Sequence, residues 1–125
     1  MPTLITCIST GKGTWTEVNK IIQSQNWNKV FLITNNFGTE NYSIKSQNTE
    51  FVIIDPNQDT LKIIQDIKKQ LNNKILDFEV AINLCSGGGK EHMAMIEAIL
   101  ELGLNFRLVT LNSQQQLEVL GIRAN

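Results

Sequence analysis

The sequence has few of the residues that build metal centres, disulfide frameworks or membrane spans. It contains two cysteines, Cys7 and Cys85, which lie far apart and show no CxxC or Cys/His spacing typical of a zinc site. We therefore expect two free thiols, no metal and no cofactor. No apolar run approaches the roughly 20 residues of a membrane-spanning helix. The start, MPTLITCIST, shows no basic leader and no cleavage signal. These absences predict a cytoplasmic protein that does not enter a membrane.

Excess charge of either sign is also lacking. The 125-residue chain is 18% charged and 42% hydrophobic, with a formal net charge of −1 and a pI of about 5.8. A protein that coats duplex DNA needs a basic surface, so we do not expect duplex DNA as a partner. A small basic pocket for one anionic ligand remains compatible with this balance. The length favours a single domain over residues 1–125.

The sequence does contain a regular alternation of apolar strand patterns and amphipathic helix patterns. The predicted strands cover 3–9, 29–34, 50–55, 78–84 and 106–111. The predicted helices cover 14–25, 59–71 and 90–102. Continuous apolar strands between helices predict an α/β, Rossmann-like three-layer fold with a mainly parallel sheet in the order 3-2-1-4-5.

Individual residues define the expected helix ends and the expected buried face of the third helix. Asp59 is the expected N-cap of the second helix, and Gly103 is the expected C-cap residue of the third. The third helix is expected to face the core with Met93, Ile96, Ile99 and Leu100.

Two segments leave alternatives open. Residues 35–48 are polar and rich in turn residues, and they are too long for a simple connection, so we expect either a short helix or a functional flap. Near the carboxyl terminus, SQQQLEVL fits a short helix, whereas QLEVLGI fits a sixth strand antiparallel to the fifth. We favour the strand.

Two glycine-containing loops, each with one lysine, follow the first and the fourth predicted strands. They are STGKGT, from Ser9 to Thr14, and SGGGK, from Ser86 to Lys90. In open parallel sheets, ligands bind beyond the carboxyl ends of the strands, where the strand order reverses. That point lies between strands one and four here, so we expect the two loops to meet in one crevice.

The residue types of these loops suit an anion or a nucleotide. Glycines let backbone N–H groups approach a ligand closely, and each loop leads into a helix whose N-terminus favours negative charge. The candidate ligand-binding residues are Gly11, Lys12, Gly13, Thr14, Asn36, Ser86, Gly87, Gly88 and Gly89. In the plainer interpretation, the glycines are turn residues and the lysines are solvated. His92 is then a helix-surface residue, and Glu91 is an acid favoured by the helix dipole.

The spacing excludes better-known glycine loops. A Walker A loop needs Ser or Thr after its lysine, but Glu91 follows Lys90 and Leu84 occupies the position of the first glycine, so we do not expect ATP hydrolysis. The dinucleotide pattern GxGxxG is only half met by Gly11 and Gly13. A GxSxG nucleophile elbow is absent.

The segment VAINLCSGGGKEHMAMIEAILELGLNFRLVTL resembles the signature of CARF domains, the CRISPR-associated Rossmann-like folds. The matching residues are Asn83, Ser86, Gly87, Gly88, Lys90, Met93 and Met95. STGKGT is similar to the first loop of that family, and the resemblance covers essentially the whole chain. The sequence departs from the family at Ser86 and Gly89, where Thr is common.

The resemblance implies a homodimer in antiviral defence that binds a cyclic oligoadenylate, tetra- or hexa-adenylate, across a twofold axis. It also implies a possible metal-independent ring nuclease, in which a ribose 2′-OH attacks the adjacent phosphate and leaves a 2′,3′-cyclic phosphate. By this resemblance Lys90 would stabilise the phosphate charge, and Ser9 or Thr10 would position the 2′-OH or the phosphate. The alternatives are a Rossmann-like module for another nucleotide or phosphometabolite, and a non-catalytic regulatory or interaction subunit.

Overall fold

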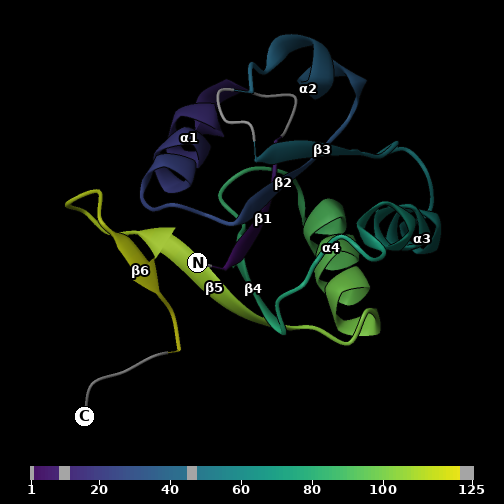
Figure 1. The fold of residues 1–125 in the computed structure, drawn as a ribbon. Helices are drawn as coiled ribbons and strands as arrows, with labels where there is room; N and C mark the ends of the chain where they lie inside the picture. Colours follow the sequence, from purple (N-terminus) through teal and green to yellow (C-terminus); the bar gives the residue numbers. More distant parts are fainter. Residues whose placement is uncertain (1, 9–11, 45–47, 122–125) are drawn as a thin grey trace.

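The computed structural model describes residues 2–8, 12–44 and 48–121, which form an α/β fold (Figure 1). In chain order its elements are β1 (Thr3–Cys7), a 3-10 turn (Lys12–Thr14), α1 (Trp15–Gln23), β2 (Lys29–Thr34), α2 (Asn36–Asn41), β3 (Thr49–Ile53), α3 (Thr60–Leu71), β4 (Glu79–Asn83), α4 (Gly89–Glu101), β5 (Asn105–Leu111) and β6 (Leu117–Val119). The predicted strands and helices are confirmed, and the carboxyl-terminal segment forms the strand we favoured.

The six strands form one sheet in the order β3-β2-β1-β4-β5-β6. All neighbours are parallel except β5 and β6, which are antiparallel. In the centre, Thr6 of β1 pairs with Leu32 on one side and with Asn83 on the other. The predicted strand order is therefore confirmed, with β6 added at the edge beside β5.

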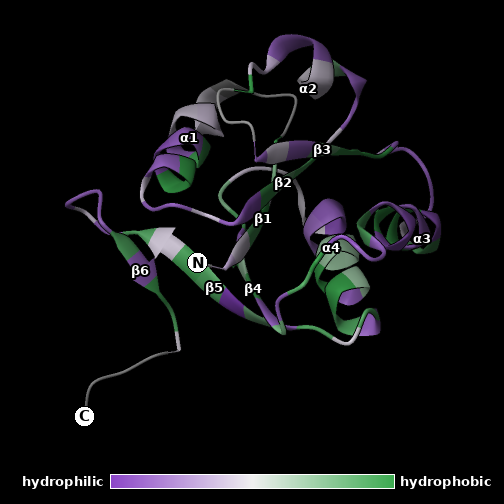
Figure 2. Cartoon of the chain, viewed as in Figure 1, coloured by the Kyte–Doolittle hydropathy of each residue, from purple (hydrophilic) through white to green (hydrophobic). Residues whose placement is uncertain are grey.

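Helices cover both faces of the sheet because successive residues of each buried strand point to opposite faces. Leu4 belongs to the core cluster under α1, whereas its neighbour Ile5 belongs to the cluster under α3 and α4. Hydrophilic and hydrophobic residues alternate along these helices (Figure 2), as expected of helices with one face on a sheet. This layering confirms the Rossmann-like architecture.

Helix α4 faces the core with only part of the predicted set: Ile99 is buried and Ile96 packs against the core, as expected. Met93 and Leu100 are 63% and 51% exposed, so their expected burial is wrong. The buried residues of this helix are Ala94, Met95, Ala98 and Ile99. These have the same helical spacing, and the two alanines are small enough to let α4 approach the sheet and α3 closely.

The polar segment after β2 contains the short helix α2, one of its two predicted alternatives. Its N-cap is Asn35, whose Oδ1 accepts a hydrogen bond from the backbone N–H of Gly38 at 3.1 Å. Asp59 occupies the predicted N-cap position of α3, but its carboxylate makes no capping hydrogen bond. Gly103 follows the end of α4 at a φ of 78°, as expected of a C-cap glycine.

Candidate functional site

The two glycine-containing loops leave the same edge of the sheet from neighbouring strands. β1 and β4 run parallel, with Thr6 opposite Asn83, so the chain leaves both strands at their carboxyl ends. The chain then continues into α1 on one face and into α4 on the other. This is the reversal of strand order where ligands bind in open α/β sheets.

A contact between Cys85 and Glu17 joins the two halves of this region. Cys85 begins the connection from β4 to α4, and Glu17 lies in the first turn of α1, just after the first loop. Burial, as the largest cause, together with the negative charge and the hydrogen bond of the Glu17 carboxylate, raises the pKa of the Cys85 thiol to about 12. Cys7 is fully buried, and burial raises its pKa as well. Both thiols are free.

The structure describes only part of the first loop. Three of its predicted residues lie outside the described residues: Ser9, Thr10 and Gly11. The side chain of Lys12 lies outside the described part as well, although its backbone opens the 3-10 turn before α1. Gly13 is exposed, with open space where a side chain would stand.

Thr14 is the most informative residue of this loop. It occupies the N-cap position of α1, but its side chain makes no capping hydrogen bond. Its hydroxyl oxygen is buried and has no hydrogen-bond partner among the described residues. Because buried hydroxyls are normally paired, this oxygen is a candidate to meet a ligand or a bound water.

In the second loop, Gly87 has a backbone conformation that only glycine adopts at low cost. Its φ is 98°, and a Cβ at this position would lie 3.0 Å from the Cβ of Cys7 and 2.9 Å from Oε2 of Glu91. The loop therefore packs directly on the end of β1. Gly89, by contrast, has open space around the position of a Cβ.

Charged and polar side chains of α4 fold back onto this loop. The N–H of Gly88, the N-cap residue, donates to Oε2 of Glu91 at 3.1 Å. The Nε2 of His92 lies 2.7 Å from the carbonyl oxygen of Ser86; because a carbonyl only accepts, Nε2 carries the proton. Both groups thus close the first turn of α4.

Ser86 is the one candidate of this loop that is almost fully buried, at 1% exposure. Asn83, rather than Ser86, fixes the path of the chain as it leaves β4. The Nδ2 of Asn83 donates to the carbonyl of Val109 at 2.7 Å, and its Oδ1 accepts from the N–H of Cys85 at 2.9 Å. Asn83 therefore holds the start of the glycine loop against β5, a role that the sequence did not reveal.

The ammonium group of Lys90 points towards the connection between β3 and α3. Its Nζ donates to the carbonyl of Pro56 at 3.2 Å, and the side chain is exposed. The donor is a charged ammonium group, but the bond is exposed to water, which screens it. Lys90 is thus held only weakly and can turn towards an anion.

A cavity of about 230 Å³ lies beside Lys90, at the carboxyl ends of β1, β2 and β3. Among the described residues that line it, Gly88 alone is a predicted ligand-binding residue. The residues that sequence reasoning missed are Thr34, Asn35, Pro56 and Glu91. Asn36, which we predicted, is exposed and begins α2, whereas its neighbour Asn35 lines the cavity. The carboxyl-end rule pointed to the end of β2 but could not separate these two asparagines.

Thr34 and Asn35 use their polar atoms to shape the cavity. The Oγ1 of Thr34 donates to the carbonyl of Ile8 at 3.0 Å, while Asn35 caps α2. A Cβ on Gly38 would lie 1.8 Å from Oγ1 of Thr34, so α2 rests directly on this threonine. The cavity is therefore bounded by fixed polar groups on the β2 side and by the start of α4 on the other.

No protein-family model matches the chain, and no curated protein is similar to it in sequence. Among the described residues, no group of three or more His, Cys, Asp or Glu side chains is placed to hold a metal ion. No helix of the described part is long and apolar enough to cross a membrane. The resemblance to CARF domains therefore stays a prediction.

Proposed function

We propose that the chain binds a cyclic oligoadenylate, tetra- or hexa-adenylate, at the glycine loops and acts as a homodimeric CARF-like domain. The observation that carries the proposal is the start of α4: a glycine-rich loop at the strand-order reversal, beside β1, with the exposed Lys90 at the rim of a cavity. Helix N-termini of this kind bind phosphates through backbone N–H groups.

The size of the cavity supports a site shared by two copies. Its volume of about 230 Å³ falls below the roughly 300–1,000 Å³ of pockets that enclose a drug-sized ligand. One chain therefore encloses only part of an oligonucleotide ring. On α4, Met93 and Leu100 are exposed and seven residues apart, which places them on one face that a second copy could cover.

Binding requires two rearrangements that the contacts allow. Lys90 exchanges the neutral Pro56 carbonyl for a phosphate, which gives a stronger hydrogen bond in which both partners are charged. Glu91 already uses the N–H of Gly88, so a phosphate either displaces this carboxylate or takes the neighbouring N–H groups. The unpartnered hydroxyl of Thr14 is a further donor on the opposite loop.

Cleavage of the ring is a separate proposal. Lys90 would stabilise the charge that develops on the phosphate, and Ser9 or Thr10 would position the 2′-OH. In the described part of the site, His92 and Glu91 are bound to the loop itself. We therefore propose slow, metal-independent cleavage driven by in-line positioning rather than by a strong general base.

One alternative is a small phosphorylated metabolite bound by a single chain, since a ligand smaller than a ring needs no more than a cavity of this volume. Calorimetry with cyclic tetra-adenylate, cyclic hexa-adenylate and AMP separates the two. We expect one of the rings to bind with about one ring per two chains. Stronger binding of AMP than of either ring would favour the alternative and reject our proposal.

The matched variants are Lys90→Ala and Lys69→Ala, the latter on the exposed side of α3. We expect Lys90→Ala to weaken ring binding at least tenfold, and Lys69→Ala to leave it unchanged. Overnight incubation of labelled ring with excess EDTA tests cleavage, and a linear product ending in a 2′,3′-cyclic phosphate is the expected result. An intact ring would mean that the chain does not cleave the ring, and only the binding proposal would remain.

A further inference from the structure

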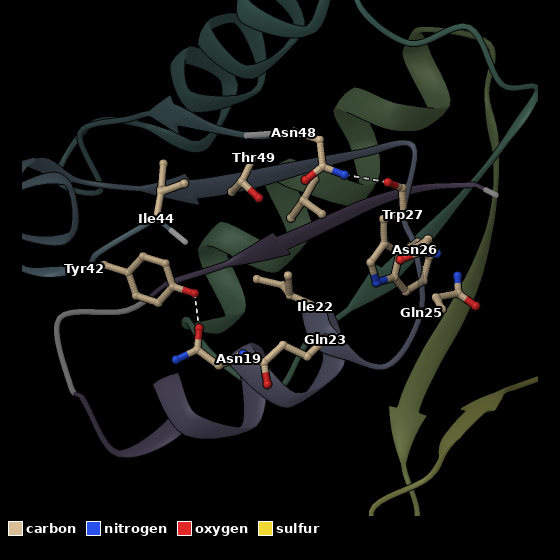
Figure 3. A pocket seen from close by; sticks show the side chains of 11 residues that line it. Asn19, Ile22, Gln23, Gln25, Asn26, Trp27, Tyr42, Ile44, Asn48 and Thr49 are labelled. Carbon is tan, nitrogen blue, oxygen red and sulfur yellow. Dashed lines mark hydrogen bonds between the residues drawn. The ribbon is translucent and has the colours of Figure 1, made fainter. Parts of the chain in front are cut away.

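A second cavity, of about 340 Å³, lies at the opposite end of the sheet (Figure 3). Val30 and Thr49, at the beginning of β2 and β3, line it together with residues of α1, the segment that follows α1, and the segment that follows α2. The glycine loops leave the carboxyl ends of the strands, so this cavity is separate from the proposed oligoadenylate site.

The polar side chains that the structure describes in the lining of this cavity are all uncharged. Five of the eleven lining residues carry side-chain carboxamides: Asn19, Gln23, Gln25, Asn26 and Asn48. A carboxamide offers both donors and acceptors. The apolar remainder includes Ile22, Val30 and Ile44. No lysine, arginine, aspartate or glutamate is among the eleven described residues of the lining, so an ionic ligand would find no counter-charge from them.

The walls are fixed by hydrogen bonds between the lining residues. The hydroxyl of Tyr42 donates to Oδ1 of Asn19, and Nδ2 of Asn48 donates to the carbonyl of Trp27 (Figure 3). The indole N–H of Trp27 donates to the carbonyl of Ile21 at 3.1 Å. The cavity is therefore largely formed before any ligand enters, as is usual for small-molecule sites.

One lining hydroxyl lacks a partner. The Oγ1 of Thr49 is buried and makes no hydrogen bond to any described residue. Its side chain points towards the cavity, opposite α1 (Figure 3). Buried hydroxyls without a partner are unfavourable and uncommon, so this oxygen is a second, independent indication of a ligand.

We propose that this cavity binds the uncharged heterocyclic base of a nucleoside. The edge of a base presents alternating donors and acceptors, which carboxamides and a hydroxyl recognise, while its faces need apolar cover. Thr49 and the carboxamides contact the edge, and Ile22, Val30 and Ile44 cover the ring. Among the lining residues that the structure describes, a phosphate finds no cation to pair with. The inference stands independently of the function proposed for the glycine loops.

Adenosine, uridine, AMP and glucose are the probes for this site. The chain has two tryptophans, and only Trp27 lines the cavity, so its indole N–H signal, assigned with Trp15→Phe, reports binding by NMR. We expect one of the nucleosides to shift the Trp27 signal saturably and more than the Trp15 signal. We also expect AMP to bind no more tightly than adenosine, and glucose to bind more weakly than the nucleosides.

Thr49→Val is the test variant, and Thr110→Val, a partly buried strand threonine of β5, is its matched control. We expect Thr49→Val to weaken nucleoside binding roughly five- to tenfold without lowering the melting temperature, because the hydroxyl has no partner within the described residues. Thr110→Val should bind like the unmodified protein.

Four results would overturn this inference: no saturable shift with either nucleoside, tighter binding of AMP, equal binding of glucose, or unchanged nucleoside affinity in Thr49→Val. Lys90→Ala distinguishes the two sites, since it should leave nucleoside binding intact. Loss of nucleoside binding in Lys90→Ala would place the nucleoside at the glycine loops and also overturn it. If Lys90→Ala loses cyclic tetra-adenylate binding and Thr49→Val keeps it, the two sites bind their ligands independently.

Discussion

The N–H of Gly88 donates to the carboxylate of Glu91 at 3.1 Å, so the chain's own anion occupies the start of α4. This position is where helix N-termini bind phosphate groups. In the described structure the glycine loop thus combines a feature that attracts an anion with a side chain that competes with it. Whether Glu91 caps the helix or opposes a ligand is measurable.

Glu91→Gln should strengthen the binding of a cyclic oligoadenylate. The amide keeps an acceptor for the Gly88 N–H but removes a negative charge whose interaction with a helix terminus is about 0.3–1 kcal/mol. We therefore expect roughly a two- to fivefold gain in affinity by calorimetry. Glu118→Gln, an exposed change on β6, serves as the control for net charge. Weaker binding in Glu91→Gln would show that the carboxylate supports the ligand instead of opposing it.

Gly87→Ala should destabilise the fold, whereas Gly89→Ala should not. At Gly87 the φ of 98° and the 3.0 Å approach to the Cβ of Cys7 make any side chain costly, and we expect a loss of about 1–3 kcal/mol in the free energy of unfolding. Gly89 has open space and begins α4, so alanine there should be neutral or stabilising by about 0.4–1 kcal/mol. Urea denaturation of both variants measures their free energies of unfolding and tests this difference. Equal stability of the two would contradict the geometry of the loop.

The fold was predictable because its signals are local. Each buried strand is a continuous apolar run, and strand and helix patterns alternate with short connections. The exposed face of α4 was predicted wrongly because we assigned the larger apolar side chains to the core. Ala94 and Ala98 are buried, whereas the larger Met93 is exposed. Close packing against α3 decided that choice, and no local pattern records it.

The place of the candidate site was predictable, but its details depend on contacts between distant residues. The carboxyl-end rule located the loops after β1 and β4. It could not show that Lys90 reaches the carbonyl of Pro56, 34 residues away, or that Thr34 lines the cavity. The direction of a long side chain is set by the elements around it, and these come from other parts of the chain.

Cys85 should react slowly with a thiol reagent in the native protein, and Glu17→Gln should accelerate the reaction. Burial, as the larger cause, and the Glu17 carboxylate together raise the pKa of Cys85 to about 12, so the reactive thiolate is scarce at pH 8. Removing the Glu17 charge lowers the pKa and shifts the pH profile of the labelling rate to lower pH. Glu40→Gln, on the exposed side of α2, should leave the profile in place. Cys7 is fully buried and should react only on unfolding. An unchanged profile in Glu17→Gln would refute the contact between Glu17 and Cys85.

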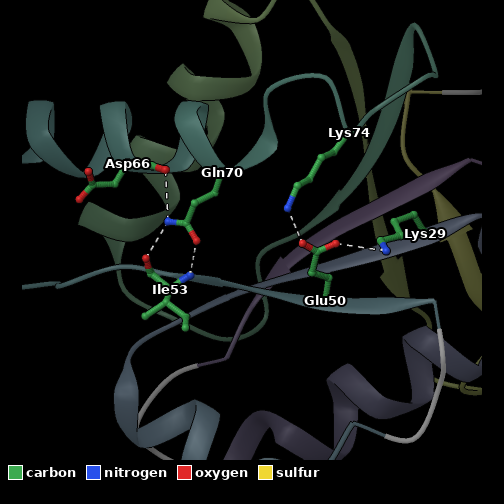
Figure 4. A network of polar contacts seen from close by, with 6 residues as sticks. All are labelled: Lys29, Glu50, Ile53, Asp66, Gln70 and Lys74. Atoms are coloured by element: carbon green, nitrogen blue, oxygen red, sulfur yellow. Dashed lines mark hydrogen bonds and ion pairs between the residues drawn. The ribbon is translucent and has the colours of Figure 1, made fainter.

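Glu50 should stabilise the fold at neutral pH but not in acid. Its carboxylate binds Lys74 and lies 3.2 Å from Nζ of Lys29 (Figure 4), and the hydrogen bond from Lys74 is the main cause of its lowered pKa. A carboxylate with a lowered folded-state pKa contributes stability above its unfolded pKa of about 4.5 and loses it as the pH falls through the folded value.

Glu50→Gln should therefore lower the free energy of unfolding by about 0.2–1 kcal/mol at pH 7, because the pair is partly exposed and screened by water. The difference from the unmodified protein should shrink in 0.5 M salt and vanish once the pH is below the folded pKa of Glu50. Urea denaturation at several pH values measures this, with Glu40→Gln as the control. A difference that persists in acid would mean that Glu50 acts through packing rather than through its charge.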